Sequence, residues 1–349
     1  MMPHPKSITH SELFRPDSSH LPKAIVETSL RPLPDAIVFT HYGRSDYLSR
    51  TLECATITNP RIRRVLIGDD TNRDLAVSAG WNHIHLDAVT SDLRTRFNEV
   101  FRWVQGPKHN PVKNGKDWLR YVFERWYVVA EYCRVEGIQQ LWHFDSDVML
   151  VEDLAFFGDV LRQKKILFTR QCNDTCLNGF VSYTVIKNFC EYIISLFNDP
   201  TLLQSQQLEF ETLHLDYAFT EMRAFAMYSK ITGYQGCHLE QAIDGWWFDD
   251  CICQDDDFEM RRLGFWGTLV KRVHFDGSRF YGHRQGGRVD FAAINCSWVP
   301  TEVFDWILSR VRRRVLQPGL RASEELAQVH LRMLDEVKGL KAIAVSKLR

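Results

Sequence analysis

The stretch Leu-Trp-His-Phe-Asp-Ser-Asp-Val-Met-Leu, residues 141–150, does most to define this sequence. Residues 141–144 predict a short strand, and Asp145 and Asp147 follow it directly. Side chains two residues apart project to the same side of an extended chain, so these carboxylates would repel each other without a cation between them. A hard divalent ion, Mg2+ or Mn2+, would bind both and keep positions free for phosphate oxygens. A plain turn or helix cap is the alternative interpretation.

Strands and helices alternate on both sides of this stretch. Upstream, the sequence predicts strands at 36–40, 65–67 and 84–86 and helices at 47–56, 74–79 and 117–136. Downstream, it predicts strands at 166–169 and 179–184 and an apolar helix that ends at 197. Asp117 would cap the long helix at its start and Gly137 at its end, whereas 91–114 is polar and mixed. We therefore predict an α/β fold, a Rossmann-type three-layer sandwich with a mainly parallel central sheet.

Polar turns follow three of the predicted strands. They are Thr40–Ser45, Asp69–Asn72 and Asp145–Asp147. In open α/β sheets, ligands bind beyond the carboxyl ends of the strands. We therefore expect these turns to contribute to one site at that edge of the sheet.

Composition and charge restrict the function further. The 349 residues are 45% hydrophobic and 25% charged, and their formal net charge of -1 gives no reason to expect nucleic-acid binding. Residues 1–34 form a Pro-rich arm without a secretory signal, and no stretch approaches the ~20 apolar residues of a membrane span. The nine cysteines mostly lie singly in apolar segments, which predicts reduced thiols and a cytoplasmic protein. Zinc at Cys172 with Cys176, or within 237–253, is the less simple alternative.

Residues 141–150 resemble the D-x-D strand of GT-A-fold glycosyltransferases. Residues 123–127, Phe-Glu-Arg-Trp-Tyr, are similar to the helix that precedes this motif in bacterial saccharide-synthesising members. The resemblance covers about residues 35–295 and is specific only at the D-x-D motif. It implies a metal-dependent enzyme that moves a sugar from a nucleoside-diphosphate donor to a hydroxyl group on a glycan or glycolipid. Uridine diphosphate (UDP) is the expected nucleotide.

The resemblance assigns donor-binding roles by position. The implied residues are Thr40, Tyr42, Arg44, Asp69, Asp70, Arg125, Asp145, Ser146, Asn178, Gly179, Gly277 and Arg279. The loop after the first strand would pack against the base and ribose, and Asp69, with Asp70 as the alternative, would accept a hydrogen bond from the base. Arg125 would face the diphosphate unless it is an ordinary surface arginine. Gly179 would let the donor sugar approach closely.

The late stretch Val-His-Phe-Asp-Gly-Ser-Arg, residues 273–279, is similar to the His-x-x-Gly-x-x-Lys element of glycogenin-like transferases. This similarity implies that His274 completes a metal site with Asp145 and Asp147. Arg279 would take the place of the phosphate-binding lysine, although it stands one position earlier in the sequence. If His274 is a ligand, the metal is expected to be Mn2+ rather than Mg2+, because a neutral imidazole suits Mn2+ better. A competing set follows at His283, Arg284 and Arg288. An ordinary core or surface histidine is the other alternative for His274.

The acceptor side carries weaker signals. Glu221 is slightly favoured over Asp216 as the base that deprotonates the acceptor hydroxyl, because Asp216 would also suit as a helix N-cap. The alternative for either residue is an ordinary solvent-exposed acid on a helix, without a catalytic role. Trp246 and Trp247 would stack on sugar faces or else belong to the core. An inverting reaction needs such a base, whereas the similarity around His274 favours retention, so the stereochemical outcome stays open.

The sequence predicts three parts of the chain. These are an N-terminal arm at 1–34, a GT-A-like catalytic domain at 35–300 and a C-terminal helical extension at 301–349. The catalytic domain would consist of a nucleotide half, 35–150, and an acceptor half, 151–300. The extension would form two helices suited to packing or self-association, with peripheral membrane association as the alternative.

Two other functions stay open at this point. A sugar-phosphate nucleotidyltransferase also combines an α/β sheet with carboxylate-bound Mg2+. It would need a Gly-rich basic loop after the first strand, where residues 41–44 contain a single glycine. A non-catalytic glycan-binding module would account for the tryptophans but not for the paired acids.

Overall fold

The computed structural model describes residues 36–109, 118–264 and 267–316. Its helices are α1 (Leu48–Thr58), α2 (Arg73–Ser78), α3 (Asp92–Val100), α5 (Trp118–Glu136), α6 (Leu154–Gln163), α7 (Tyr183–Asn198), α8 (Pro200–Thr212), α9 (Glu221–Tyr228) and α10 (Thr301–Leu316). Its strands are β1 (Ala36–Thr40), β2 (Arg64–Gly68), β3 (Asn82–His85), β4 (Gln140–Asp145), β5 (Val148–Leu150), β6 (Phe168–Gln171), β7 (Cys176–Ser182), β8 (Gly236–His238), β9 (Trp246–Phe248), β10 (Met260–Arg262), β11 (Leu269–Lys271), β12 (His274–Phe275), β13 (Phe280–Arg284) and β14 (Gly287–Asn295). Short 3-10 helices are η1 (Asp70–Asn72), η2 (Leu86–Ala88) and η3 (Leu239–Gln241).

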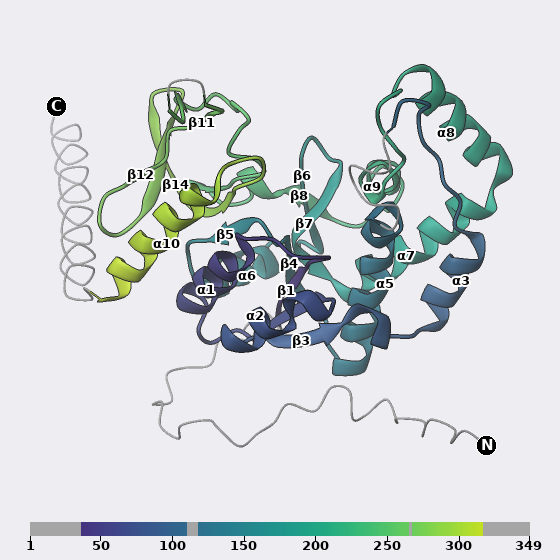
Figure 1. Ribbon diagram of the computed structural model, residues 1–349, viewed down its shortest axis with the longest axis horizontal. Helices are drawn as coiled ribbons and strands as arrows, with labels where there is room; N and C mark the ends of the chain where they lie inside the picture. The colour runs from purple at the N-terminus through teal and green to yellow at the C-terminus, as the bar shows by residue number, and fades with distance from the viewer. Residues whose placement is uncertain (1–35, 110–117, 265–266, 317–349) are drawn as a thin grey trace, which may run out of the picture.

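A seven-stranded sheet with the order β3-β2-β1-β4-β7-β6-β8 lies at the centre of the described structure (Figure 1). Strands β3, β2, β1 and β4 are parallel, and β8 is parallel to β6. Strand β7 runs antiparallel to both of its neighbours, β4 and β6. The predicted α/β fold with a mainly parallel central sheet is confirmed. The predicted succession of βαβ crossovers is wrong after β4, because β7 reverses direction there.

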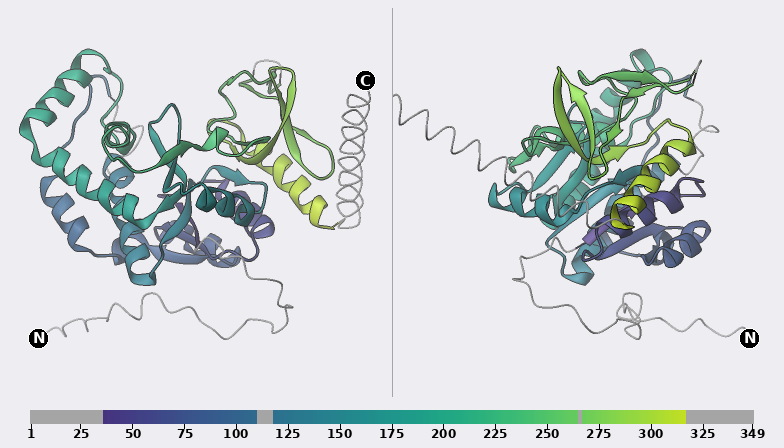
Figure 2. Two further views of the ribbon diagram at one scale, coloured as in Figure 1. Left: turned by 180° about the vertical axis from the view of Figure 1, so that it is seen from behind. Right: turned by 90° about the vertical axis from the view of Figure 1, so that its left-hand side faces the viewer.

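Helices cover both faces of this sheet (Figures 1 and 2), and β1 shows why the sequence requires them. All five of its residues are buried. Ala36 and Val38 join the apolar cluster that includes side chains of α5 and α7. Ile37 and Phe39 point to the other face and join the cluster that includes α1 and α6. A strand buried on both faces reads as a continuous apolar run, as this one does.

A second sheet, of five strands, contains β12, β13, β14 and β5 in that order, with β9 beside β14. Only two residues, Ser146 and Asp147, separate the end of β4 from the start of β5, and Val148 of β5 pairs antiparallel with Asn295 of β14. The turn that contains Asp145, Ser146 and Asp147 therefore carries the chain from the central sheet into the second sheet. This crossing fixes both aspartates at the junction of the two sheets.

Three helices in the structure, α3, α6 and α8, were not predicted, and two of them, α3 and α8, begin with clear capping signals. In α3, the Ser91 hydroxyl accepts a hydrogen bond from the Arg94 backbone N–H at 3.1 Å, and Phe97 is fully buried. In α8, Asp199 caps the first turn and Pro200 is the first residue, where its fixed φ suits a helix. Ser and Asp caps followed by a helix-compatible residue are the signals that would have identified both.

The first C-terminal helix, α10, packs against α1 rather than standing apart. The rings of Tyr47 and Phe304 stack with centroids 5.0 Å apart, and Arg312 forms an ion pair with Glu53 at 2.6 Å. Three predictions fall outside the described residues: the N-terminal arm, the Asp117 cap and the second C-terminal helix. The predictions of self-association and of membrane association depend on that second helix and therefore stay predictions. Within the described ranges, no helix is long and apolar enough to cross a membrane.

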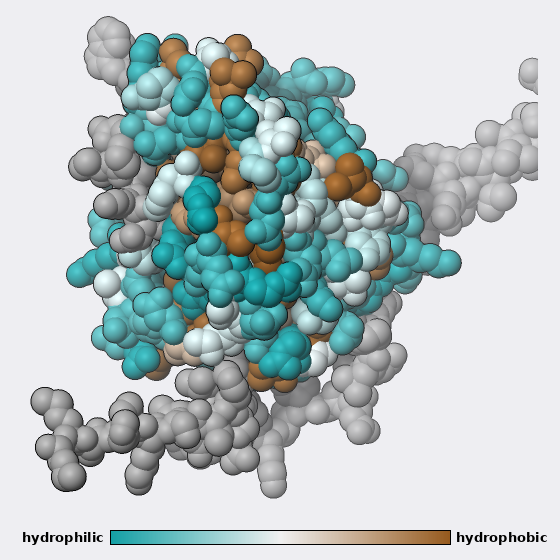
Figure 3. Space-filling model, turned by 90° about the vertical axis from the view of Figure 1, so that its right-hand side faces the viewer, coloured by the Kyte–Doolittle hydropathy of each residue, from teal (hydrophilic) through white to brown (hydrophobic). Residues whose placement is uncertain are grey.

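Apolar side chains reach the surface on the side of the molecule that carries α3 and α8. Figure 3 views this side and shows them lining a hollow among polar side chains. Large exposed hydrophobic residues in or just after α8 are Leu208, Leu213 and Tyr217, and Met222 follows in α9. Glu221 begins α9, so this surface adjoins one of the predicted site residues in sequence.

Gly179 is required by packing within the central sheet. Its φ of +86° lies in the left-handed region, and a Cβ there would meet the side chains of Leu239 and Thr169. The predicted role of Gly179, to let a donor sugar approach, does not fit this arrangement because the protein's own side chains fill that space.

We expect Gly179→Ala to lower the free energy of unfolding by about 2–4 kcal/mol, from backbone strain and steric overlap together. Gly137→Ala is the matched control, because Gly137 also has a positive φ (+68°) but a Cβ there meets no atom within 4 Å. Urea unfolding of both variants measures the difference. Equal losses would contradict the packing explanation.

Candidate functional site

The predicted turns at the strand ends do meet at one edge of the central sheet. Asp145 is the last residue of β4 and is the register partner of Thr40, the last residue of β1. Asp69 follows β2, which is the other neighbour of β1. The side chain of Asp145 is 45% exposed, so this edge is open to ligands from solvent.

The guanidinium of Arg125 holds the centre of the site together. Arg125 extends from α5, and its Nη1 donates to Asp145 Oδ1 at 2.5 Å while its Nη2 donates to Glu221 Oε1 at 2.7 Å. A longer contact of 3.4 Å joins Nη1 to the hydroxyl of Thr40. Arg125 and Glu221 are only 12% and 8% exposed. Arg125 is therefore a buried, doubly paired residue and not a surface helix arginine.

Asp147, two residues further along the chain, has different hydrogen-bond partners from Asp145. Its Oδ2 accepts a hydrogen bond from the Ser297 hydroxyl at 2.7 Å. Its Oδ1 is buried and has no hydrogen-bond partner in the described part of the chain. Buried polar atoms are nearly always paired, and an unpaired carboxylate oxygen is costly. A divalent cation between Asp145 and Asp147 would supply the partner, so the donor set fits Mg2+ or Mn2+.

The carboxyl groups of the site differ in their pKa values. Loss of solvent, reinforced by the negative charge of Asp145, raises the pKa of Asp147 to about 6. Loss of solvent would also raise the pKa of Asp145, but the Arg125 guanidinium outweighs it and holds that pKa below its usual value. Burial raises the pKa of Glu221 despite its bond to Arg125. Crowded acids with shifted pKa values are typical of functional sites.

A small cavity lies beside Arg125, Asp145 and Glu221. Its volume is about 30 Å³, room for about one water molecule rather than a sugar. Asn178 also lines this cavity, but its side-chain amide donates to Gln171 Oε1 at 2.7 Å. A sugar or diphosphate would therefore approach the carboxylates from the exposed side of Asp145.

The predicted donor-binding residues at and after the end of β1 differ in their exposure and in their neighbours. Thr40 is buried, and its hydroxyl lies 3.3 Å from His143 Nε2. Tyr42 is exposed, and its ring lies 5.2 Å from the ring of Tyr121. Arg44 lines a different cavity, of about 470 Å³, between α1 and the start of α10. The structure thus separates Arg44 from the residues around Arg125.

Asp69 and Asp70 follow β2 but have unequal environments. Asp69 caps η1, and its two carboxylate oxygens accept from the backbone N–H groups of Gly43 (2.5 Å) and Thr71 (2.8 Å). Loss of solvent would raise the pKa of Asp69, but the Thr71 hydroxyl and these two N–H groups together outweigh it and lower that pKa. Asp70 is 80% exposed on its side chain, beside His85. Asp69 already stabilises these loops, so a nucleotide base would have to share its carboxylate with Gly43 and Thr71.

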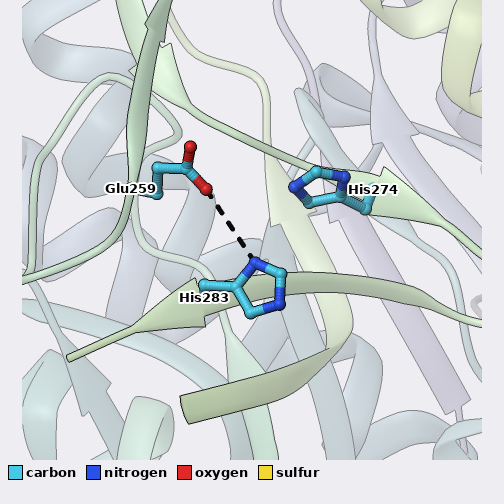
Figure 4. A group of neighbouring side chains, drawn as sticks. All are labelled: Glu259, His274 and His283. Atoms are coloured by element: carbon cyan, nitrogen blue, oxygen red, sulfur yellow. Dashed lines mark ion pairs between the residues drawn. The ribbon is translucent and has the colours of Figure 1, made fainter. Parts of the chain in front are cut away.

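The predicted metal site of Asp145, Asp147 and His274 is not formed. His274 lies on β12, where it gathers with Glu259 and His283 (Figure 4). Among the described residues, no group of three metal-ligating side chains includes Asp145 or Asp147. The reason is topological, because β12 lies at the outer end of the second sheet whereas β5, which follows Asp147, lies at its other end.

The other predicted residues of the second sheet are also held by their neighbours. Gly277 lies in the open turn between β12 and β13 with a φ of +102°. Arg279 pairs with Asp290 at 2.9 Å and covers the ring of Trp246, 5.0 Å from its centroid. Trp247 is only 5% exposed and belongs to the core. The predicted tryptophan platform for an acceptor is therefore wrong for Trp247, and one face of Trp246 is occupied.

The two candidate bases are clearly different in the structure. Glu221 is the first residue of α9 and faces Arg125. Asp216 is exposed in the turn between α8 and α9, and Thr220 rather than Asp216 is the N-cap of α9. The N-cap prediction for Asp216 is wrong, because four residues of irregular chain separate it from the helix.

Two residues that sequence reasoning missed complete the turn. His41 Nδ1 lies 2.7 Å from the hydroxyl of Ser146, and burial lowers the pKa of His41 to about 4, so its imidazole is neutral. His41 directly follows the first strand, which is a signal that could have identified it. Ser297, which binds Asp147, is 150 residues away in sequence and carries no local signal.

A cluster of acids in the segment between β9 and β10 is structural. Lys271 is fully buried, and its Nζ lies 2.5 Å from carboxylate oxygens of both Asp249 and Asp256. The ammonium group stands where a cation bound by these acids would lie. The cysteines of the described residues are free thiols, and no metal-ligating group there includes one.

We expect Arg125→Met to lower the free energy of unfolding at neutral pH by about 3–5 kcal/mol, because it leaves Glu221 buried without its partner. The pKa of Asp145 is lowered by Arg125 in the wild type, so that contribution is present above the unfolded-state pKa and is lost as pH falls. In the variant the unpaired acids take up protons instead, so its deficit should shrink as pH falls towards the usual carboxyl pKa values.

Arg120→Met is the control for this prediction. Arg120 is 43% exposed on its side chain and pairs with Glu124 on the same helix. Such pairs contribute at most about 1 kcal/mol. Urea unfolding at several pH values tests both variants. A deficit for Arg125→Met that equals that of Arg120→Met, or that grows in acid, would contradict the account.

Comparison with known proteins does not assign the chain to a family. No protein-family description matches the sequence, and no curated protein matches it. The solved structures similar to it include a cytidylyltransferase from Leptospira borgpetersenii serovar Hardjo-bovis (strain JB197), with a TM-score of 0.30 and 10% identity over 50% of this chain and 73% of that one. They also include the PaToxG glycosyltransferase, with a TM-score of 0.29 and 14% identity over 58% of this chain and 71% of that one. Likenesses of this size support no conclusion about activity.

Proposed function

We propose that this protein is a metal-dependent glycosyltransferase that moves a sugar from a nucleoside-diphosphate donor, UDP-linked by preference, to a hydroxyl group on a glycan or glycolipid. One observation carries the proposal. Asp145 and Asp147 flank the turn at the carboxyl end of β4, and Asp147 presents a buried carboxylate oxygen without a partner in the described structure. Strand ends of this kind are where α/β proteins bind nucleotides.

The acids of this turn would hold the metal ion. Mg2+ or Mn2+ bound by Asp145 and Asp147 would neutralise the charge that develops on the leaving diphosphate. Arg125 keeps the Asp145 carboxylate in place and adds a fixed positive charge next to it. Donors fixed before the reaction need no reorganisation during it, which is the main source of electrostatic catalysis.

The acceptor would bind on the side of Glu221. Glu221 is the better candidate for the base, because it shares Arg125 with Asp145 whereas Asp216 is exposed outside this network. With Trp247 in the core, the exposed side chains of Tyr217 and Met222 offer apolar surface next to Glu221 in the chain. Such surface suits the apolar face of a sugar or the lipid of a glycolipid.

Release of nucleoside diphosphate from a panel of nucleotide sugars, with Mn2+ present, tests the proposal. We expect release by the wild type and a loss of at least about 100-fold in Asp147→Ala, because metal stabilisation of the leaving group contributes several kcal/mol. Asp74→Ala is the control, since Asp74 is an exposed acid in the first turn of α2 and should keep the wild-type rate.

Three results would contradict the proposal. Wild-type rates in Asp147→Ala would exclude this aspartate from the reaction. Release of pyrophosphate from a nucleoside triphosphate and a sugar phosphate, with no release of diphosphate from nucleotide sugars, would instead establish a nucleotidyltransferase. Binding of glycans without either reaction would indicate a non-catalytic module.

A further inference from the structure

We propose that Glu259, His274 and His283 form a zinc site, separate from the Asp145–Asp147 turn and independent of the proposed glycosyl transfer. These residues, the histidine cluster, come from the segment that enters β10 and from strands β12 and β13. Their side chains point toward one another (Figure 4). The three would supply two imidazole nitrogens and one carboxylate oxygen, and water would complete the coordination.

The ligand atoms of the histidine cluster are already close. One ligand atom from each side chain lies within 4.8 Å of the other two. Glu259 Oε2 lies 3.9 Å from His283 Nδ1, and the rings of His274 and His283 have centroids 5.4 Å apart. Zinc bonds of about 2.0–2.2 Å place tetrahedral ligand atoms about 3.3 Å apart. The side chains therefore need to move inward by only about 1.5 Å at most.

The backbone holds the three ligands in register without a metal. His274 pairs with Tyr281 across β12 and β13, and His283 follows two residues later on β13. The backbone N–H of Glu259 donates to the carbonyl oxygen of His283 at 2.9 Å. Because each segment is hydrogen-bonded to the next, binding would require side-chain adjustment alone, and such preorganisation favours affinity.

The neighbours of the histidine cluster leave its ligand atoms available. Arg272 Nη1 donates to Glu259 Oε1 at 2.5 Å, so the other oxygen of this carboxylate faces His283. Arg272 also brings a positive charge, which weakens cation binding but fixes the carboxylate. The ring of Tyr281 stacks on His274 at 5.1 Å and restricts its rotation. Partners that orient the ligands in this way are usual around metal ions.

His274 supplies the observation that favours a ligand over an ordinary ion pair. Its Nε2 is buried, and no hydrogen-bond partner for it exists among the described residues. One ring nitrogen of His274 faces Glu259 and His283 in Figure 4. A buried nitrogen without a partner carries an energetic cost, which coordination would remove.

The donor set is one that zinc uses in proteins. Imidazole ligands with one carboxylate suit Zn2+, whereas the all-oxygen pair Asp145 and Asp147 suits Mg2+ or Mn2+. A bound ion would add a second link between the segment before β10 and the β12–β13 hairpin, which the backbone hydrogen bond between Glu259 and His283 already joins. Two His and one carboxylate with an open fourth position also match the ligand count of zinc sites that bind water.

Zinc binding to the full chain, freed of metal by a chelator, tests the site. Competition with a chromophoric zinc indicator measures affinity, and the visible spectrum of the Co2+ form reports the coordination. We expect one zinc equivalent to bind, at least about 10-fold weaker binding in His274→Ala and in His283→Ala, and loss of that equivalent in the double variant. Asp147→Ala should keep it, which separates this site from the proposed active site.

His214→Ala is the matched control. His214 lies 3.3 Å from Glu209 and is about as exposed as His283, but no third ligand accompanies this pair in the described structure. Equal zinc affinity in the wild type and in the His274 and His283 variants would overturn the proposal. So would an equal loss in His214→Ala. Thermal unfolding without metal establishes that each variant is folded, and zinc should raise the unfolding temperature only where the histidine cluster is intact.

Discussion

The passage of the chain from one sheet to another within three residues constrains the whole site. Strand β4 ends the parallel part of the central sheet at Asp145, and Val148 already pairs in the second sheet. Asp145 is held by Arg125, from the central-sheet side, and Asp147 by Ser297, from the side of the second sheet. The two carboxylates cannot move apart without disturbing one of the sheets. The position of each carboxylate is thus fixed by the fold.

The balance of charge at this site indicates which ligands it would bind. Arg125 bonds two carboxylates, those of Asp145 and Glu221, and Asp147 adds a third carboxylate whose pKa is raised by the charge of Asp145. Loss of solvent, and then the charge of Asp145, raises the pKa of Asp147, and one of its buried oxygens has no partner among the described residues, so the negative charge of this carboxylate is poorly compensated. A cation would relieve it, and a diphosphate bound to that cation would restore the negative charge beside Arg125. The site therefore suits a metal together with a phosphorylated ligand better than either alone.

Local patterns were sufficient for part of the fold and of the site. The buried run of β1, the glycine that ends α5 and the acids at the end of β4 could be predicted because strand burial and turn chemistry are encoded in neighbouring residues. The reversal of β7 and the position of His274 could not, because they depend on pairings between distant strands. The same limit applies to Trp247, whose burial follows from the packing of β9 beside β14. Arg125 was identified by resemblance, and its bond to Glu221 needed the structure.

The most direct test of the account is Mn2+ binding in the presence of UDP, followed by electron paramagnetic resonance. The account predicts that UDP-dependent Mn2+ binding is lost in Asp147→Ala and retained in His274→Ala, because His274 belongs to a different cluster. Binding that survives Asp147→Ala but is lost in His274→Ala would contradict the central claim, that the Asp145–Asp147 turn is the metal and nucleotide site.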